Sequence, residues 1–431
     1  MSLPEKHHLT RRALLGGTAA VGAGALLASA APAIADAVPG SGSVDQKSVD
    51  AVAARLDRHL VALRRDIHRH PETAGEEGRT AAMVAGRLRS AGLTVTTGVG
   101  GHGVVGVLDG ARPGRTVAYR ADMDAVPPGD QIEGAGKAAH LCGHDLHTTV
   151  GVGVAQVLAR LRHRLSGRLV FLFQPAEEAL TGARAMLADG VLEWTRPQEI
   201  HALHCGPFPV GQFAVTPGTG LPGQDRSVVT LQGPDAAEQA RRLAAAIAEL
   251  NTVALPVTSA DFEWLVQNLQ KPNGPLARSI AIRARAGEAD AEGKAKVEVS
   301  YRCWPEERYV EVRDKLRGLA EPYAGSQVSF PAEPFPAMVC PEQEGRALER
   351  HLRRVLGPDA VTVLHAAIPF SGEDYALFLD RIPGTFTFLG VRAPGADITT
   401  CYPHLGGFDP DERAIGIGVR AMAGWLAKRL G

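Results

Sequence analysis

The spacing of apolar residues along the chain predicts helices and strands in alternation. Helical spacing predicts one helix over 49–69, which Pro71 ends, and a second over 76–91. Further on, β-rich and apolar runs predict strands at 93–97, 104–108, 116–120, 169–173 and 200–204, with helices at 147–161 and 183–188. Strands that alternate with helices predict an α/β domain, a mostly parallel sheet flanked by helices.

The pattern changes between 218 and 331. The expected order there is strand, helix, strand, strand, helix, strand, which is typical of a split βαβ unit and predicts an inserted ferredoxin-like α+β domain. Its strands are expected at 226–232, 279–286, 295–303 and 327–330, and its helices at 236–250 and 308–319. After the insert, the pattern of the first domain resumes at 345–356, 384–389 and 415–429. We therefore expect a catalytic domain formed by 46–217 and 332–431, interrupted by an insert at 218–331.

The N-terminal segment has the features of an export signal. Arg11 and Arg12 precede a weakly apolar stretch rich in glycine and alanine, and small residues follow at 33–35 and 35–37, where cleavage is expected. We interpret 1–37 as a twin-arginine signal peptide and expect an exported, extracytoplasmic or secreted protein. The alternative is a surface arginine pair ahead of a core helix. No other segment is long and apolar enough to span a bilayer, so no membrane contact is expected after signal removal.

Composition narrows the function classes. The chain has 431 residues, of which 45 % are hydrophobic, and a formal net charge of −1. This favours a globular protein and excludes the broad basic field that nucleic acids or anionic lipids require. The five cysteines are an odd number, which argues against a complete disulfide framework. Any of the four other than Cys142 could pair.

Two short motifs carry the candidate chemistry. Cys142 and His144 are two residues apart, and Glu177 and Glu178 follow the apolar strand expected at 169–173. Thiolate, imidazole and carboxylate are ligands of zinc and similar ions, and of two adjacent carboxylates one can bind metal while the other moves protons. The combination points to a metal-dependent hydrolase. Since ligands gather beyond the carboxyl ends of parallel strands, Asp122, Glu177, Glu178 and His204 are expected to converge.

Each of these residues also has an ordinary interpretation. A lone histidine such as His204 or His404 is more commonly a surface or core residue, and Cys142 alone is more commonly a small buried side chain. The two glutamates could begin a solvated helix, where carboxylates favour the helix dipole. For His68 and His70 we prefer the ordinary interpretation, a helix end with cationic side chains near its last carbonyls.

Five motifs in order resemble one enzyme family. They are DIHRHPE at 66–72, RADMDAVP at 120–127, CGHD at 142–145, QPAEE at 174–178 and GEDY at 372–375. The mature chain resembles the N-acyl-amino-acid amidohydrolases of the aminoacylase/carboxypeptidase superfamily, which includes hippurate hydrolases and plant auxin-conjugate hydrolases. The resemblance implies two divalent metal ions per chain, zinc or manganese. It implies as ligands Cys142, His144, Glu178, His204 and His404. It also implies Glu177 as general base, and the insert as a lid and homodimerisation domain.

The departures from the family lie in the insert. Relatives carry a histidine after the first lid strand and an asparagine-bearing turn between two later strands. Here the first strand continues through 232–235 into a helix without a histidine, and the acidic segment 288–294 takes the place of that turn. In relatives these side chains hold the substrate carboxylate and the developing oxyanion, so substrate closure is altered here. If the free carboxylate is still preferred, Arg226, Arg283 and Arg302 are the candidates to bind it.

We expect an exported metal-dependent amidohydrolase that cleaves N-acyl amino acids or small peptide-like amides. Glu177 is expected to take a proton from a metal-activated water and deliver it to the leaving amine. One alternative is a dipeptidase or carboxypeptidase that acts on free peptides. Another is a metal-bearing binding protein whose turnover weakened when the lid groups were lost. This interpretation of the sequence assigns no substrate-binding residue.

Overall fold

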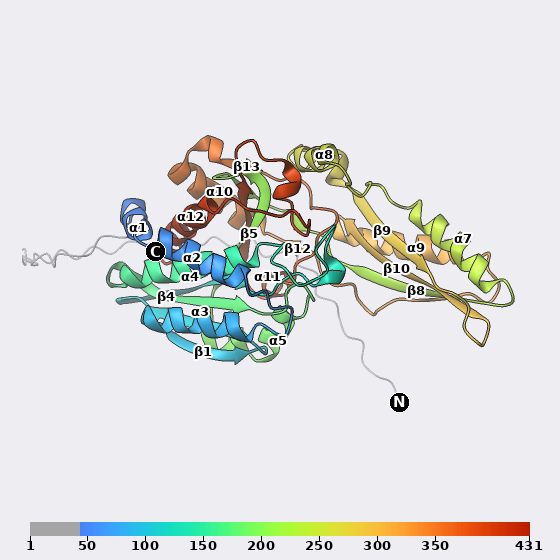
Figure 1. Ribbon diagram of the computed structural model, residues 1–431, viewed down its shortest axis with the longest axis horizontal. Helices are drawn as coiled ribbons and strands as arrows, with labels where there is room; N and C mark the ends of the chain where they lie inside the picture. Colours follow the sequence, from blue (N-terminus) through green and yellow to red (C-terminus); the bar gives the residue numbers. More distant parts are fainter. Residues whose placement is uncertain (1–43) are drawn as a thin grey trace, which may run out of the picture. The chain divides into compact units, whose positions relative to one another are not determined.

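The larger sheet of the protein has a parallel centre and antiparallel flanks. A computed structural model describes residues 44–431 (Figure 1). Eight strands in the order β1-β2-β4-β3-β5-β14-β6-β13 form this sheet. Their bounds are β1 Thr94–Val99, β2 Gly103–Asp109, β3 Arg112–Asp122, β4 Ser166–Gln174, β5 Glu199–Pro209, β6 Phe213–Val215, β13 Val361–Val363 and β14 Gly384–Arg392. The run β4-β3-β5-β14 is parallel, as is β6 with β13, whereas β1 with β2, β2 with β4, and β14 with β6 are antiparallel. The expected α/β fold is confirmed, with a mixed rather than purely parallel sheet.

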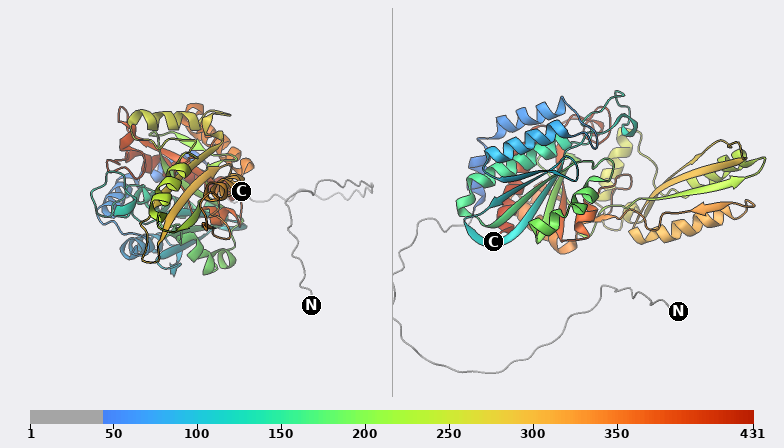
Figure 2. Two further views of the ribbon diagram at one scale, coloured as in Figure 1. Left: turned by 90° about the vertical axis from the view of Figure 1, so that its right-hand side faces the viewer. Right: turned by 90° about the horizontal axis from the view of Figure 1, so that it is seen from below.

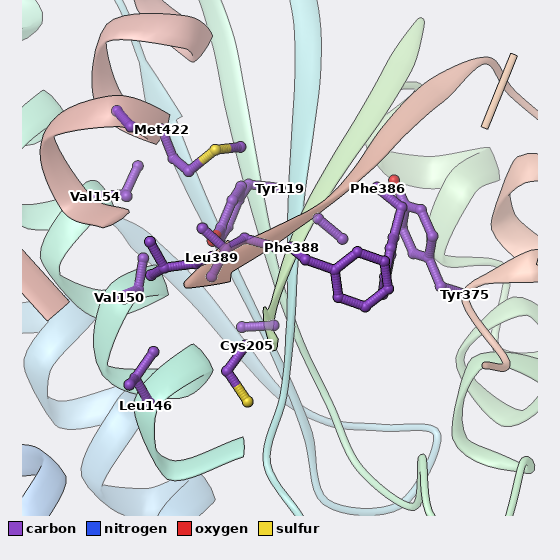
Figure 3. Close-up of a cluster of buried hydrophobic side chains, with 14 of the residues drawn as sticks. Tyr119, Leu146, Val150, Val154, Cys205, Tyr375, Phe386, Phe388, Leu389 and Met422 are labelled. Carbon is purple, nitrogen blue, oxygen red and sulfur yellow. The ribbon is translucent and has the colours of Figure 1, made fainter. Parts of the chain in front are cut away.

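Helices pack along this sheet. The longer ones are α1 Gln46–Ala53, α2 Asp57–His68, α3 Gly78–Ser90, α4 His144–Arg160, α10 Glu342–Leu356 and α12 Arg413–Arg429, and the shorter ones are α5 Gly182–Ala188, α6 Val191–Thr195 and α11 Ala376–Leu379. Almost every residue of α4 is buried, because α2, α12 and the sheet all contact it. Figure 3 shows Val150 of α4 beside Leu389 of β14, with Leu146 one turn earlier in the same helix. This packing holds the first turn of α4 firmly against the sheet.

The single helix expected over 49–69 is wrong, because α1 and α2 are separate helices. The chain turns at 54–56, and Leu56 at the turn is itself buried together with Val49 and Leu60. The apolar spacing therefore continues through 54–56, although the helix is interrupted there. The other expected elements of this domain differ from the structure by a few residues at their ends.

A second, four-stranded sheet is formed within the expected insert. Its strands are β8 Asp225–Gln232, β9 Ser279–Ala286, β10 Lys294–Trp304 and β11 Gln327–Ser329, antiparallel and in the order β11-β8-β10-β9. Helices α7 Ala236–Ala248 and α9 Tyr309–Ala320 accompany this sheet (Figure 2). Their side chains Leu243 and Val312 belong to one core with Val297. The two short strands β7 Gly220–Leu221 and β12 Met338–Val339 pair where the chain enters and leaves this region. The domain boundaries 218 and 331 stay predictions.

One helix of the insert was not expected from the sequence. Helix α8, Ser259–Leu269, starts with a capping box in which Thr258 and Asp261 each accept from the other's backbone N–H. Its buried side chains, including Phe262 and Leu265, belong to the large core of the first sheet rather than to the core of the insert. The segment 218–331 therefore contributes to both cores.

The N-terminal prediction falls outside the described part of the chain. The signal peptide expected at 1–37 precedes residue 44, where the description begins. Among the helices of 44–431, none has the length and apolar character needed to cross a bilayer. All five cysteines lie in the described part, and all are buried and free.

Candidate metal centre

Parallel strand ends bring the candidate residues together. Strands β4, β3 and β5 are neighbours in the sheet, and Asp122 at the end of β3 pairs in register with Gln174 at the end of β4. Glu177 and Glu178 follow shortly after β4, and His204 lies in β5. Ligating atoms of Asp122, His144 and His204 lie within 4.8 Å of one another. In the structure these side chains meet at one edge of the sheet, as expected.

A glycine turn sets Cys142 and His144 on the same cluster. Gly143 between them has φ = 87°, and a Cβ there would lie 2.4 Å from the Sγ of Cys205. Only glycine fits both the backbone conformation and the space. Helix α4 then begins at His144, so this imidazole is fixed by a buried helix.

Glu178 is the point where the remaining candidates meet. Its Oε1 is 3.7 Å from the Nε2 of His144, and its Oε2 is 3.3 Å from the Nε2 of His404. Cys142 belongs to the same group of neighbouring donor atoms, and its Sγ is 3.5 Å from the Nε2 of His204. The five residues predicted as ligands therefore form one connected cluster, and their roles as ligands stay predictions.

Two residues of the cluster's loops have strained backbones. Ala176, next to Glu177, has φ = 53°, and His404 has φ = 68°. Left-handed conformations at residues other than glycine cost on the order of 1–3 kcal/mol each and persist where the surroundings enforce them. Such strain is concentrated at functional sites, which agrees with the position of both residues.

Hydrogen bonds orient two imidazoles toward the cluster. The Nδ1 of His204 lies 2.7 Å from the carbonyl oxygen of Cys205, and the Nδ1 of His404 lies 3.0 Å from that of Asp130. A carbonyl only accepts, so Nδ1 carries a proton in both rings, and Nε2 is the nitrogen whose lone pair is available in the neutral ring. That Nε2 is the atom facing Cys142 in one case and Glu178 in the other. Both histidines thus present the nitrogen that a metal needs.

The pKa values in the cluster reflect buried negative charge. Burial disfavours the charged form of His144, but Asp122, Asp124 and Glu178 outweigh this effect and raise its pKa to about 10. Burial and nearby carboxylates raise the pKa of Cys142 well above its usual value. Burial lowers the pKa of His204, which stays neutral. Metal binding must therefore displace protons from His144 and Cys142.

Glu177 lies beside this cluster among further carboxylates. Its Oε2 is 3.8 Å from the Nε2 of His144, and its donor atoms also approach Glu373 and Asp374. Burial together with Glu373, Glu178 and Asp374 raises its pKa well above the usual value. A carboxyl group with a raised pKa is suited to accept and release a proton near neutral pH.

One buried arginine forms ion pairs with the most deeply buried of these carboxylates. Arg120, 1 % exposed, donates to Asp122 at 2.5 Å and to Glu373 at 2.9 Å. Its guanidinium is also 3.3 Å from Asp374, whose pKa burial raises to about 7. Buried carboxylates thus outnumber the arginine, and buried charge of one sign requires protons or cations.

The sequence reasoning missed the residues that support the cluster. Asp124 lies 3.2 Å from the Nδ1 of His144 through Oδ1 and accepts from the backbone N–H of Glu178 through Oδ2 at 2.9 Å. His147 approaches Asp122 at 2.7 Å through Nδ1, and its Nε2 accepts from the N–H of Cys205 at 2.7 Å. Although His147 lies among the donor atoms, both of its nitrogens are already engaged, so it does not fit a ligand. Asp124 lies in the motif at 120–127, and its position there was the available signal.

The two histidines near the end of α2 are separate from the cluster. His70 Nδ1 lies 2.8 Å from the carbonyl of Asp66, near the last turn of α2, as the preferred interpretation expects. His68 differs, because its Nδ1 lies 2.8 Å from Asp145, which also pairs with Arg64. Neither histidine belongs to a donor group within 44–431.

The acidic turn of the insert lies at the far end of its sheet. Glu288 approaches Arg241 of α7 at 3.6 Å, and Asp290 accepts from the N–H of Lys294 within the same turn. Strand β10 runs from Lys294 to Trp304, so Arg302 is eight residues from this turn, which corresponds to roughly 26 Å. This distance separates the acidic turn from the candidate site of the same chain.

Arg302 at the other end of β10 approaches the cluster instead. A Cβ built on Gly372 would lie 2.2 Å from its Nη1, so its guanidinium rests on the backbone beside Glu373. It donates to the carbonyl of Pro222 at 3.4 Å, and the negative charge of Glu177 acts on it. Of the three arginines named from the sequence, Arg302 is the one close to the candidate site.

The cluster fits a divalent metal site. The Nε2 of His144 and the Oε1 of Glu178 are buried and have no hydrogen-bond partner among the described residues. Their separation of 3.7 Å is too long for a hydrogen bond. It suits two ligands of one ion with bonds of about 2.0–2.2 Å. The donor set of thiol, imidazole and carboxylate is that of zinc and related metals.

Comparisons with known proteins identify the chain's relatives. The sequence profile of peptidase family M20/M25/M40 matches residues 118–428. A probable hydrolase of Synechocystis is 31 % identical over 386 residues, which cover 86 % of this chain and 96 % of that protein. An N-acetyldiaminopimelate deacetylase of Enterococcus faecalis is 28 % identical and covers 85 % and 97 %. The crystal structure of a dinuclear metal-binding M20 peptidase from Bacillus subtilis superimposes with a TM-score of 0.66 at 27 % identity, covering 88 % of this chain and 99 % of that one.

Proposed function

The chain belongs to peptidase family M20/M25/M40 and is a metal-dependent amide hydrolase, and we propose that it cleaves the amide bond of N-acyl amino acids or small peptide-like amides. We propose two divalent ions per chain, zinc or manganese, held by the five-residue cluster of Cys142, His144, Glu178, His204 and His404. When bound, such ions supply Lewis-acid polarisation of a carbonyl and acidification of water. The observation that carries the proposal is Glu177, a buried carboxyl group whose Oε2 is 3.8 Å from the Nε2 of His144.

Glu177 acts as the proton carrier of the reaction. It takes the proton of the attacking water and returns it to the leaving amine. Its position beside the metal ligands supports this role, and so does the raised pKa that burial and Glu373 cause. The buried network of Arg120 and Asp374 keeps the neighbouring carboxylates fixed while the proton moves.

Arg302 binds the carboxylate of the substrate. Its guanidinium lies on the backbone of Gly372, and Glu177 acts on it electrostatically, so it is close to the reacting groups. Arginine pairs with carboxylates through two parallel N–H donors. In relatives a lid histidine and a lid asparagine bind this carboxylate, and this sequence lacks both. We propose that Arg302 of the same chain takes over their role.

A substrate panel tests the proposal. Metal-loaded protein is given N-acetyl amino acids, the matching carboxamides, and dipeptides, and amine release is measured. We expect the N-acetyl amino acids to be hydrolysed with a higher kcat/KM than their carboxamides, and the preference to disappear in Arg302→Gln. Faster hydrolysis of dipeptides would indicate the peptidase alternative, and binding without hydrolysis of any compound would indicate the binding-protein alternative.

Export and assembly complete the proposal. The arginine pair Arg11 and Arg12 supports twin-arginine export of the folded protein to an extracytoplasmic location, although it precedes the described residues. The insert is proposed as lid and as homodimer contact. Nucleic acid is not a proposed partner.

A further inference from the structure

The open face of the four-stranded sheet is strongly basic. One face of this sheet packs on α7 and α9, and the side chains that alternate with the buried ones point away from those helices. Six cationic residues lie on this open face: Arg226, Arg283, Arg285, Lys294, Lys296 and Arg302. Glu298 is its one acidic residue among the residues of β8 to β11. Within 44–431, none of the six cations forms an ion pair.

Three of these cations surround one position of β10. Ser300 pairs in register with Arg226 of β8 on one side and with Arg283 of β9 on the other. Neighbouring strands are about 4.8 Å apart, so Arg226 and Arg283 are about 10 Å apart across β10. Arg302 lies two residues along β10 on the same face, which completes a triangle of guanidinium-bearing positions. We call Arg226, Arg283 and Arg302 the arginine triangle.

The charges of the triangle act on one another. Burial and the positive charges of Arg226 and Arg283 lower the pKa of Arg302 to about 10, while Glu177 opposes them. Three like charges without a carboxylate partner destabilise one another until an anion binds between them. Arg226 and Arg283 are exposed, so a ligand can reach them.

The triangle is continuous with the candidate metal centre. Its inner corner, Arg302, rests on Gly372, and the next residue, Glu373, receives hydrogen bonds from Arg120 in the cluster of buried carboxylates. The other two corners, Arg226 and Arg283, lie level with Ser300, which is two residues further along β10 from the metal centre than Arg302. A substrate whose first carboxylate binds Arg302 would therefore carry its next acidic group to Arg226 or Arg283.

We propose that Arg226 and Arg283 form a second anion subsite, and that the enzyme prefers amides whose amine side carries two or more carboxylates, such as N-acylated glutamate or aspartate and short acidic peptides. This inference rests on the proposed function and extends it from one carboxylate to two. The occupant is the substrate's own acidic side chain, because the subsite is adjacent to the first carboxylate position and opposite in charge to such a group.

Paired substrates test the subsite. N-acetyl-glutamate and N-acetyl-glutamine are nearly the same size and differ by one negative charge. At low salt, metal-loaded protein is expected to show a kcat/KM for N-acetyl-glutamate about tenfold or more above that for N-acetyl-glutamine, the range of a charge-assisted hydrogen bond. In the double variant Arg226→Gln/Arg283→Gln this ratio is expected to fall toward one. The matched control is Arg285→Gln, an exposed arginine on the same face outside the triangle, which should keep the ratio.

A wild-type ratio near one would overturn the subsite, as would an unchanged ratio in the double variant. An equal fall in the Arg285→Gln control would also overturn it, because it would indicate a general basic field that attracts any polyanion. A binding measurement separates this failure from failure of the proposed function. If no N-acetyl amino acid is hydrolysed, calorimetric titration with glutamate and glutamine decides: tighter glutamate binding that the double variant abolishes supports the subsite, and equal binding refutes it.

Discussion

Replacing Asp124 by asparagine should weaken metal binding without removing any predicted ligand. Asp124 is fully buried, and its two oxygens face the Nδ1 of His144 at 3.2 Å and the backbone N–H of Glu178 at 2.9 Å. As a carboxylate it accepts from both, which leaves the Nε2 of His144 free for a metal. Asparagine has the same shape but only one acceptor atom, so it cannot satisfy both neighbours.

Either orientation of the new amide is unfavourable. If its oxygen accepts from Glu178, its NH₂ group faces the Nδ1 of His144, and the ring proton must move to Nε2, where it blocks the metal. If the amide is reversed, its NH₂ group meets the N–H of Glu178, and a buried donor is left without an acceptor at a cost of about 1–3 kcal/mol. Loss of such supporting partners typically lowers metal affinity about 10–100-fold, or about 1.4–2.7 kcal/mol. The cost of the unsatisfied donor and the typical loss of metal-binding free energy are therefore of the same order of magnitude.

The assay is zinc competition with a chelator of known affinity, on wild type, Asp124→Asn and the control Asp109→Asn. Asp109 is an exposed aspartate whose contact is the surface residue Arg168. We expect the zinc Kd to rise about 10–100-fold in Asp124→Asn and to stay unchanged in the control. Equal zinc affinity in all three proteins would refute the argument that Asp124 determines the tautomer of His144.

Three further outcomes are expected. Glu177→Gln should retain metal and lose about 10²–10⁴-fold in turnover, whereas Glu178→Gln should lose metal as well, and equal metal content in the two variants would contradict this division of roles. Burial alone would raise the pKa of Glu199, but the nearby His201 imidazole and hydrogen bonds from Arg429 outweigh it and lower the pKa to about 2. The depressed pKa contributes about 3 kcal/mol of stability above pH 4.5, which is lost as the pH falls toward 2. Urea unfolding at pH 6 and pH 3 should therefore show Glu199→Gln destabilised at pH 6 and much less so at pH 3, and an equal difference at both values would argue against the shift. Replacing Arg11 and Arg12 by lysine should leave precursor in the cytoplasm on cell fractionation, and undiminished mature protein outside it would argue against twin-arginine export.

Much of the fold could be predicted because its signals are local. Strand β9 begins and ends at the residues that the alternation indicates, and the apolar runs place the ends of β3 and β4 within two residues of Asp122 and Gln174. Helix α8 also has local signals in the sequence, the capping box of Thr258 with Asp261 and helical apolar spacing, although no helix was expected there. The break between α1 and α2 had no such signal, since Leu56 is buried at the bend itself.

The cluster's residue types could be predicted, whereas its supporting contacts could not. The sequence displays the thiol, imidazole and carboxylate groups directly, the parallel sheet predicts that Glu178 and His204 converge, and the full set of five ligands is what the family resemblance implies. The contacts of Asp124 with His144 and of Arg302 with Gly372 join segments distant in the sequence. Their existence depends on side-chain directions and on how the insert meets the first domain, and neither leaves a periodic pattern in the chain.

The most direct test of the account is the metal dependence of amide hydrolysis, measured as amine release from N-acetyl amino acids by one preparation before chelation, after chelation and after reloading, with metal content determined at each stage. The account predicts that hydrolysis falls on chelation and returns in step with zinc or manganese up to two ions per chain. Hydrolysis that survives complete metal removal, or its absence in protein that holds two ions, would contradict it.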